Sequence, residues 1–426
     1  MNSFWRIFFL ELTAAVRSKS LLLLLIASVA WMVAAPFLFV GDGTVEGSRA
    51  LAVHYSLGGV AALLAVSLLV SATGSIAGER SAKRLQLTLV RPVRYIVVAL
   101  AKMAALVSLG ALVLATATAV EACRSDLSRP CRHVLSPILP TPREEAVMAY
   151  EAFMSNPDTP AAAKRAKKQV VLRLLAQRAL DRYETIGTNS VAKWNFKVEE
   201  ASAQADGLAV RLRFTNAYDI RQDVRGELLL RIGESLWSGS VSNITQAVVE
   251  VPLVRIREGA VCCGTAELTF RNIGGSAVML RPRRDVNLLS PADGFGWNLI
   301  RAYVELVAML SILVAFGVFL GAGLGRPVAL FTAIVALIVS EMSPSVIEQY
   351  PDELETDRLD AIGLYITRAA AEATHPISSL VPLEKLSEDA CIERREVLRT
   401  ATANMVFAPL ILALLAALAM PRKVEV

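Results

Sequence analysis

Histidine is scarce in this sequence, with three residues at positions His54, His133 and His375. Their separation gives no support to a histidine-based catalytic triad, and a structural role is the better interpretation of each. The sequence also lacks a phosphate-binding glycine-lysine loop, a zinc-protease helix and a nucleophile elbow. Ser190 and Lys193 have the spacing of a serine–lysine pair, but that spacing is common by chance and its companion motifs are missing. We therefore expect no catalytic residue, metal site or cofactor on this chain.

Charge is scarce too, since charged residues make up 19% of the chain and hydrophobic residues 54%. A soluble domain typically has about 25% charged and roughly 45–50% apolar residues. The composition excludes a wholly soluble protein and also a disordered one. The net charge of +5 does not by itself indicate any class of partner. We expect no nucleic acid among the partners. With 426 residues, the chain exceeds a domain of ~100–200 residues, so a membrane part and a water-exposed part are expected.

Long apolar stretches are the main feature of the sequence. Crossing the hydrocarbon core of a bilayer takes about 20 mostly apolar residues. Six stretches qualify, namely Ser20–Val40, about His54–Ile76, Tyr95–Val120, about Leu299–Leu320, Val328–Ser340 (whose core is short and which extends to about Ile347) and Ala401–Met420. The first is longer than the apolar core of a signal peptide and more spans follow it, so we interpret it as a span. The sequence thus predicts a membrane α-helical bundle of six transmembrane helices.

The distribution of lysine and arginine predicts the orientation. The N-terminal segment, the loop after the second span, the turn after the fourth and the C-terminal tail, counted with Lys102 just inside the third span, hold 12 basic and 3 acidic residues. In contrast, Met342–Thr400, counted with Glu341, holds 13 acidic and 6 basic residues. Basic residues in short loops mark the cytoplasmic side. We therefore predict a multi-pass protein of the bacterial cytoplasmic (inner) membrane with both termini in the cytoplasm.

Two polar segments are predicted to lie on the outer side. The larger one begins with predicted helices at Arg143–Phe153 and Ala161–Tyr183, and its period then changes to that of strands. The predicted strands are Trp194–Val198, Leu208–Phe214, Glu227–Ile232, Val248–Val254, Thr265–Arg271 and Ser276–Leu280. Short strands separated by turn residues predict a small antiparallel β-sandwich, preceded by helices, as an extracytoplasmic α+β insert. The smaller segment predicts short helices at Ile362–Thr374 and Glu384–Leu398.

These elements define the predicted domain boundaries. Residues 1–120 contain an interfacial helix and the first three spans. The aromatic stretch Phe4–Leu10 indicates that helix. The outer helical and β-sandwich domain occupies residues 121–298. Spans four and five, the outer helical segment, and the last span with its cytoplasmic tail occupy residues 299–341, 342–400 and 401–426.

All five cysteines fall in the segments predicted to lie outside, where disulfides persist. Cys123 and Cys131, eight residues apart around Pro130, are the candidate disulfide. Of the adjacent pair Cys262 and Cys263, one could reach Cys391. Unbridged thiols are the alternative throughout, and no second ligand pair stands at a zinc-like spacing.

Two patterns within the predicted spans concern packing and charge. Gly317, Gly321 and Gly325 recur at four-residue spacing, which favours close helix packing over a kink that faces a pore. Arg301 and Glu305 lie one helical turn apart at the start of the fourth span. A pair that neutralises itself is favoured there over a substrate contact.

The loop after the second span is the most informative part of the sequence. Its residues of interest are Glu79, Arg80, Lys83, Arg84, Leu85, Leu89, Arg91 and Pro92. Apolar anchors with cationic flanks suit a short helix that docks in the groove of a partner protein. Positive charge at the cytoplasmic end of a span would explain the arginines, but not the glutamate–arginine start or the proline stop.

The chain resembles the type-2 ATP-binding-cassette (ABC) exporter permeases in Glu79-Arg80, Leu85, Leu87, Leu89, Pro92-Val93 and Lys102. The resemblance extends to Glu11-Leu12 followed by Arg17-Ser18-Lys19. The family's usual Gly-Thr before the first leucine is Lys83-Arg84 here, and the resemblance leaves residues 121–298, a large insert between spans three and four, unexplained. It implies a permease that works as a homo- or heterodimer by alternating access. It also implies a separate cytoplasmic ATPase that holds ATP and Mg²⁺ and binds the loop.

An alternative from another class is a membrane-anchored envelope interaction protein whose β-domain binds a surface ligand without transport. Six spans are more than a simple anchor needs. In both interpretations the expected partners include membrane lipid and an envelope partner for the β-domain.

Overall fold

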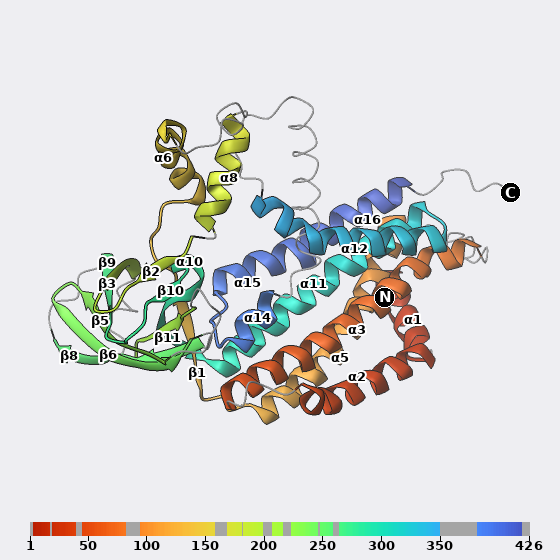
Figure 1. Cartoon of the computed structure of the whole chain (residues 1–426). Coiled ribbons are helices and arrows are strands. Elements are labelled where there is room, and N and C mark those ends of the chain that lie inside the picture. The colour runs from red at the N-terminus through yellow and green to blue at the C-terminus, as the bar shows by residue number, and fades with distance from the viewer. Residues whose placement is uncertain are drawn as a thin grey trace. The chain divides into compact units, whose positions relative to one another are not determined.

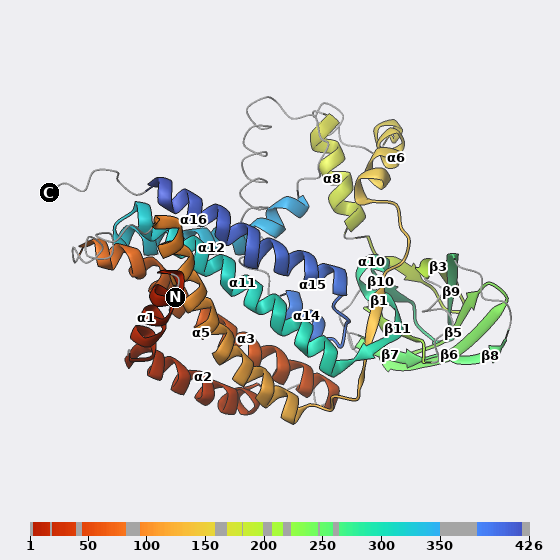
Figure 2. The same ribbon diagram turned by 180° about the vertical axis from the view of Figure 1, so that it is seen from behind.

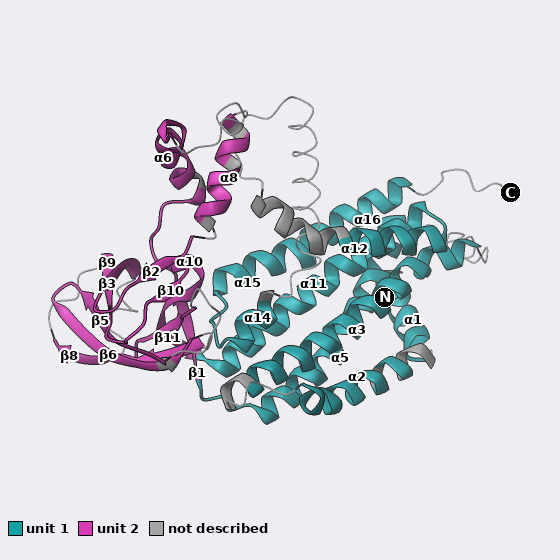
Figure 3. Cartoon of the chain, viewed as in Figure 1, with its two compact units in different colours: residues 1–129, 294–346, 362–426 teal, residues 130–293, 347–361 magenta. Residues whose placement is uncertain are grey.

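The computed structural model describes residues 3–17, 19–39, 45–81, 94–157, 168–180, 182–198, 207–215, 223–245, 248–258, 264–349 and 381–419. It divides into two compact units, which Figure 3 distinguishes by colour. The helical unit contains Met1–Arg129, Gly294–Val346 and the C-terminal helices, and the β unit is built mainly from Pro130–Asp293. Each unit is described separately below.

The helical unit consists of long apolar helices and a few short ones. They are α1 (Ser3–Arg17), α2 (Lys19–Leu38), α3 (Val45–Ser81), α5 (Tyr95–Arg124), α11 (Phe295–Gly323), α12 (Arg326–Gln349), α14 (Val381–Ser387), α15 (Arg394–Ala401), a π-helical turn (Thr402–Phe407) and α16 (Ala408–Ala419). Figures 1 and 2 show α3, α5 and α11 running alongside one another. Their contact faces form one hydrophobic core that includes Leu64, Leu114 and Leu310.

Four stretches of the described helices are long and apolar enough to cross a membrane. They are Ser48–Ser81, Tyr95–Arg124, Phe295–Gly323 and Arg394–Ala419. Two shorter apolar helical stretches, Ile26–Leu38 and Arg326–Ile338, fall within the predicted first span and across the predicted fifth. Many apolar side chains of α2, α12 and α16 are exposed, as expected of surfaces that face lipid. The chain is therefore a transmembrane helical protein that also carries a β-rich region.

The described part of the β unit contains antiparallel sheets, two longer helices that pack against each other, and one short helix. The strands are β1 (Pro130–Leu135), β2 (Glu184–Ile186), β3 (Val191–Val198), β4 (Ala209–Arg213), β5 (Asp223–Ile232), β6 (Ser235–Ile244), β7 (Val248–Pro252), β8 (Val254–Arg257), β9 (Gly264–Asn272), β10 (Val278–Leu280) and β11 (Val286–Gly294). The main sheets have the orders β1-β11-β4-β7 and β3-β9-β5-β6-β8, and β10 pairs with β2. The helices are α6 (Pro142–Ser155), α8 (Lys168–Leu180) and the short α10 (Pro282–Asp285).

Side chains of both main sheets form a single hydrophobic core. Leu212 and Leu288 of the first sheet belong to the same buried cluster as Trp194, Leu228 and Phe270 of the second. The alternation that predicted strands is clearest in β3 and β5, where every second side chain is buried. The opposite face of these two strands is polar, so this sheet has one dry face and one wet face.

The structure adds strands that the period-two pattern did not reveal. β6 carries serines on its exposed positions and starts with a buried Ser235, so its apolar alternation is weak. β11 lies between the last predicted strand and the fourth predicted span, and it pairs with β4 through Val286 and Leu288. Short strands such as β1, β2 and β8 depend on a neighbouring strand for their hydrogen bonds, and their own sequences signal this only weakly.

The prediction of one continuous helix at Glu384–Leu398 is wrong. The chain forms α14 and α15 instead, and they are interrupted around Asp389, whose φ is +55°. Asn298 of α11 binds the backbone on both sides of Cys391 in this interruption. Tertiary hydrogen bonds therefore replace the helical ones at this point. The predicted helix at Ile362–Thr374 lies outside the described residues.

Candidate functional site

Three charged side chains from three different helices meet at one end of the helical unit. Lys102 of α5 has a side chain that is only 3% exposed. Its Nζ lies 2.9 Å from Glu11 Oε2 of α1 and 2.8 Å from Glu79 Oε1 of α3. Nζ also donates to the backbone oxygen of Ser75, at 3.3 Å. We call Glu11, Glu79 and Lys102 the Lys102 cluster.

In the Lys102 cluster, two carboxylates neutralise an ammonium group whose burial in a membrane protein would otherwise cost free energy. An ionisable group within a span is normally paired, and it marks a functional site by default. Each of the two carboxylates keeps some exposure, so the cluster lies at the edge of the bundle. Two carboxylates face one ammonium, and Oε2 of Glu79 has no hydrogen-bond partner among the described residues. The cluster therefore ties α1, α3 and α5 together through a single cation.

Arg80, the neighbour of Glu79, ties α3 to a fourth helix. Its guanidinium donates to the backbone oxygens of Ala322, at 2.9 Å, and Leu324, at 2.7 Å. These carbonyls belong to the C-terminal end of α11, where backbone acceptors lack intrahelical donors and a cation is favoured. The adjacent residues Glu79 and Arg80 thus connect the last turn of α3 with α1, α5 and α11.

The glycines of α11 lie along its contact with α3. A Cβ on Gly317 would lie 2.8 Å from Ala72 Cβ, and one on Gly321 would lie 2.5 Å from the backbone oxygen of Thr73. Gly325, in the turn before α12, has nothing within 4 Å. Two of the three glycines therefore let α11 approach the same α3 segment that leads to Glu79, and the third does not.

The remaining residues predicted for the coupling loop are Lys83, Arg84, Leu85, Leu89, Arg91 and Pro92, and they lie outside the described residues. α3 ends at Ser81 and α5 begins at Tyr95. The Lys102 cluster and Arg80 are therefore the parts of the predicted site for which the structure gives contacts.

A second polar contact was missed by sequence reasoning. Asn298 of α11 is fully buried, its Nδ2 donates to the backbone oxygen of Ala390, and its Oδ1 accepts from the backbone nitrogen of Ile392, both at 2.8 Å. Arg301, one turn later, donates to the backbone oxygen of Ile392 at 3.0 Å and to Cys391 Sγ at 3.3 Å. The sequence signal was an asparagine at the apolar start of a span. Arg301 therefore helps to hold this backbone, whereas Oε1 of Glu305 is buried and has no hydrogen-bond partner among the described residues.

The structure also corrects the predicted disulfide. Cys123 and Cys131 are not bridged to each other. Cys123 is exposed in the last turn of α5, whereas Cys131 is buried and its Sγ donates to the backbone oxygen of Asp293 at 2.8 Å. Eight-residue spacing cannot predict that one thiol is turned into the β unit. Cys262 and Cys263 lie outside the described residues.

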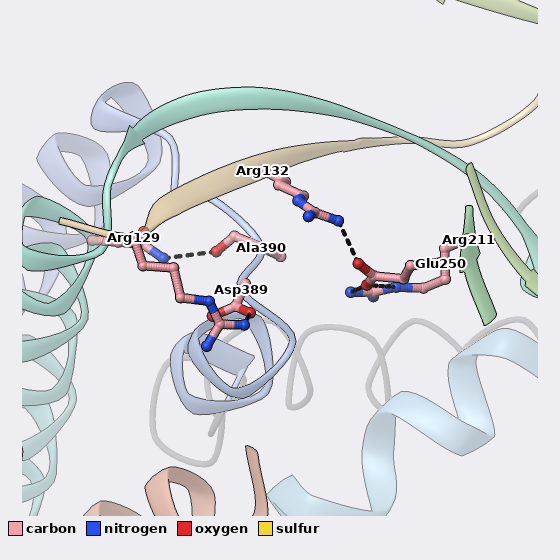
Figure 4. Close-up of polar contacts among 7 residues, drawn as sticks. Arg129, Arg132, Arg211, Glu250, Asp389 and Ala390 are labelled. Atoms are coloured by element: carbon pink, nitrogen blue, oxygen red, sulfur yellow. Dashed lines mark hydrogen bonds and ion pairs between the residues drawn. The ribbon is translucent and has the colours of Figure 1, made fainter. Parts of the chain in front are cut away.

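Figure 4 shows further ion pairs, one within the helical unit and one cluster within the β unit. In the helical unit, Arg129 pairs with Asp389, next to the backbone segment that Asn298 holds. In the β unit, Nη2 of Arg211 in β4 lies 2.8 Å from Oε1 of Glu250, the residue directly opposite it in β7. Arg132 of β1 pairs with the same carboxylate.

The serine–lysine spacing does not form a catalytic pair in the structure. Lys193 lies on the exposed face of β3, and its Nζ is 2.7 Å from Glu267 Oε1 of β9. The hydrogen bond from Lys193 lowers the pKa of Glu267. Ser190 precedes the strand, and its backbone oxygen accepts from Asn272. Lys193 is thus engaged in a surface ion pair. No group of three or more potential metal ligands occurs among the residues that the structure describes.

Comparisons with known proteins add no relative. No protein-family model, no curated protein and no solved structure matches this chain. The functional argument therefore depends on the residues and contacts described above.

Proposed function

We propose that this chain is the membrane subunit of an ABC exporter, driven by a separate cytoplasmic ATPase and paired with a second permease. One observation carries the proposal. Glu11, Glu79 and Lys102, which the sequence motif singles out, are joined by ion pairs at the last turn of α3. Arg80, the next residue of the motif, binds the end of α11 instead. Residues far apart in the chain thus converge beside the loop to which the motif assigns ATPase binding.

The arrangement suits a permease that receives mechanical work from outside. A displacement of residues 82–93 acts first on the end of α3. α3 is a continuous helix of 37 residues, roughly 55 Å long, and it moves as a stiff element. The Lys102 cluster and the Arg80 contacts would pass that displacement to α1, α5 and α11. Alternating access would follow from the rocking of these helices.

The experiment is affinity purification of the full-length chain from native membranes in a mild detergent. We expect a stoichiometric nucleotide-binding subunit, identified by mass spectrometry, and ATP hydrolysis in the eluate. Exchange of Leu85→Asp together with Leu89→Asp should release this subunit, because a charged side chain cannot occupy an apolar groove. The matched control, Gln86→Asp with Thr88→Asp, adds the same charges within the same segment and should retain it.

The outcomes separate the two function classes. A wild-type chain that purifies as a folded protein without any ATPase would favour the envelope interaction protein. Retention of the ATPase by the folded Leu85→Asp, Leu89→Asp variant would refute the assignment of the coupling loop.

A further inference from the structure

The helical unit contains a charged cavity at the end of α5 that is remote from the Lys102 cluster. Its volume is about 310 Å³, and it lies where the end of α2, the start of α3 and the end of α5 meet. Its polar lining comes from Arg49, Ser56, Glu121 and Arg124, and its apolar lining includes Pro36 and Phe37. The coupling mechanism proposed above uses none of these residues.

Glu121 is the key residue of this cavity. It is only 4% exposed, and its Oε1 accepts a hydrogen bond of 3.0 Å from Ser125 Oγ. A carboxylate kept out of water in a membrane protein requires a cationic or strongly donating partner. The hydroxyl of Ser125 is neutral, so the cavity beside Glu121 is a place where a cation would be stabilised.

Two guanidinium groups line the same cavity. Arg124 donates to the backbone oxygen of Met32 at 2.9 Å, which ties α5 to α2. Arg49 is exposed in the first turns of α3. The nearby Asp126 is outside the lining and accepts from the backbone nitrogen and hydroxyl of Ser128, at 3.1 and 2.6 Å. These hydrogen bonds, with a contribution from Arg49, lower the pKa of Asp126. The cavity thus offers two cations and one buried anion.

The depth of the cavity corresponds to a membrane interface. Glu121 lies nineteen residues beyond Lys102 in the continuous helix α5, a rise of roughly 28 Å. This is close to the ~30 Å thickness of the hydrocarbon core, so the two charged sites lie at opposite interfaces.

Aromatic side chains from the segments of α2 and α3 that adjoin the cavity-lining residues in the chain support the same depth. Trp31 Nε1 donates to the backbone oxygen of Tyr55 at 2.8 Å, and the rings of Phe39 and Tyr55 stack with centroids 3.8 Å apart. Tryptophan and tyrosine are enriched at the level of lipid headgroups.

The charges and the depth together define the ligand. We propose that this cavity binds the headgroup of a membrane phospholipid that carries a primary amine, as phosphatidylethanolamine does. The phosphate would lie against Arg49 and Arg124, and the ammonium would donate to Glu121. A headgroup that joins phosphate and ammonium through two carbons is small enough for a cavity of 310 Å³. Phe37, which is 82% exposed at the rim, would contact the acyl chains.

The same chemistry predicts selectivity among lipids. Phosphatidylglycerol has the phosphate but no ammonium, so it would compete with Glu121 for the two arginines and donate nothing charged to Glu121. Phosphatidylcholine has a quaternary ammonium that cannot donate a hydrogen bond. We expect phosphatidylethanolamine to bind about tenfold more tightly than either lipid, as the loss of one charge-assisted hydrogen bond implies. This inference is independent of the ATPase assignment.

The test measures lipid binding to the full-length purified protein by native mass spectrometry and by the shift of its melting temperature. The probes are dioleoyl phosphatidylethanolamine, phosphatidylglycerol and phosphatidylcholine, together with soluble glycerophosphoethanolamine. Preference for the first lipid supports the proposal. Equal binding of the three lipids overturns it. Binding of the soluble compound as tight as that of the lipid would assign the cavity to a free phosphoamine instead.

Variants locate the site. Glu121→Gln should abolish the preference over phosphatidylcholine, and Arg49→Gln should weaken binding of all three lipids. Glu384→Gln and Arg395→Gln, at exposed positions of the same unit, should leave both quantities unchanged. Because Arg49 is exposed, its variant is expected to fold even if the Glu121 variant does not. Wild-type lipid selectivity in folded Glu121→Gln, or wild-type affinities in Arg49→Gln, would contradict the assignment.

Discussion

Lys102 and Glu79 form an ion pair of 2.8 Å between α5 and α3, at the point where α3 is about to end. The same ammonium holds Glu11 of α1, so three helices share one buried cation. A shared cation makes the relative positions of these helices sensitive to a single side chain. It also makes the cluster open to a direct test.

Removal of the cation should destabilise the protein. Lys102→Met leaves two carboxylates facing each other without a counterion, and we expect a loss of about 2 kcal/mol, less than for a fully buried pair because both carboxylates are partly exposed. The measurement is the thermal unfolding of the purified protein in detergent. Lys193→Met, which breaks an exposed ion pair, should cost less than about 0.5 kcal/mol. Equal effects of the two variants would show that the cluster has no special role in stability.

Asn298 should control the order of the chain between α14 and α15. Asn298→Ala leaves the buried backbone groups of Ala390 and Ile392 without their side-chain partners, and we expect a cost of about 2–4 kcal/mol. Hydrogen exchange should accelerate selectively at Ala390–Ala401. Asn195→Ala, on the exposed face of β3, is the control and should change neither quantity. Unchanged exchange at Ile392 in the Asn298 variant would contradict this role.

The two glycines Gly321 and Gly325 should respond differently to the same change. A Cβ on Gly321 would meet the backbone oxygen of Thr73 at 2.5 Å, so α3 and α11 must move apart in Gly321→Ala. We expect a loss of about 1–3 kcal/mol in unfolding free energy. Gly325→Ala introduces a methyl group with nothing within 4 Å and should be neutral. Similar melting temperatures for the two variants would disprove the close approach.

The ion pair of Lys193 and Glu267 should give a small pH dependence. Lys193 lowers the pKa of Glu267, so the ionised carboxylate favours the folded state. This contribution is present above the ordinary pKa of a glutamate, about 4.3, and is lost as the pH falls through the lowered folded-state value. Wild-type protein should exceed Glu267→Gln slightly in stability at pH 6, and the difference should shrink as the pH falls below the ordinary pKa of a glutamate. A difference that stays constant over this range would exclude the electrostatic origin.

Local pattern determined much of the architecture. The apolar runs around Leu64, Leu114 and Leu310 predicted helices that the structure places in one hydrophobic core. The alternation in β3 and β9 predicted strands that pair with each other along the whole of β3. Hydropathy and periodicity succeed here because burial of one face, or of a whole helix, leaves its mark on residues that are close in the chain.

The sequence alone therefore determined the membrane-spanning character and the β-rich insert. It also identified the candidate functional residues Glu11, Glu79, Arg80 and Lys102. The tertiary structure decided that Glu11, Glu79 and Lys102 meet, whereas Arg80 binds the end of α11. It also decided that Asn298 interrupts the predicted helix Glu384–Leu398 and that β11 is a strand. The reason is physical. Glu11 lies 91 residues from Lys102, and its pairing depends on which faces of α1 and α5 come together, which no local pattern records.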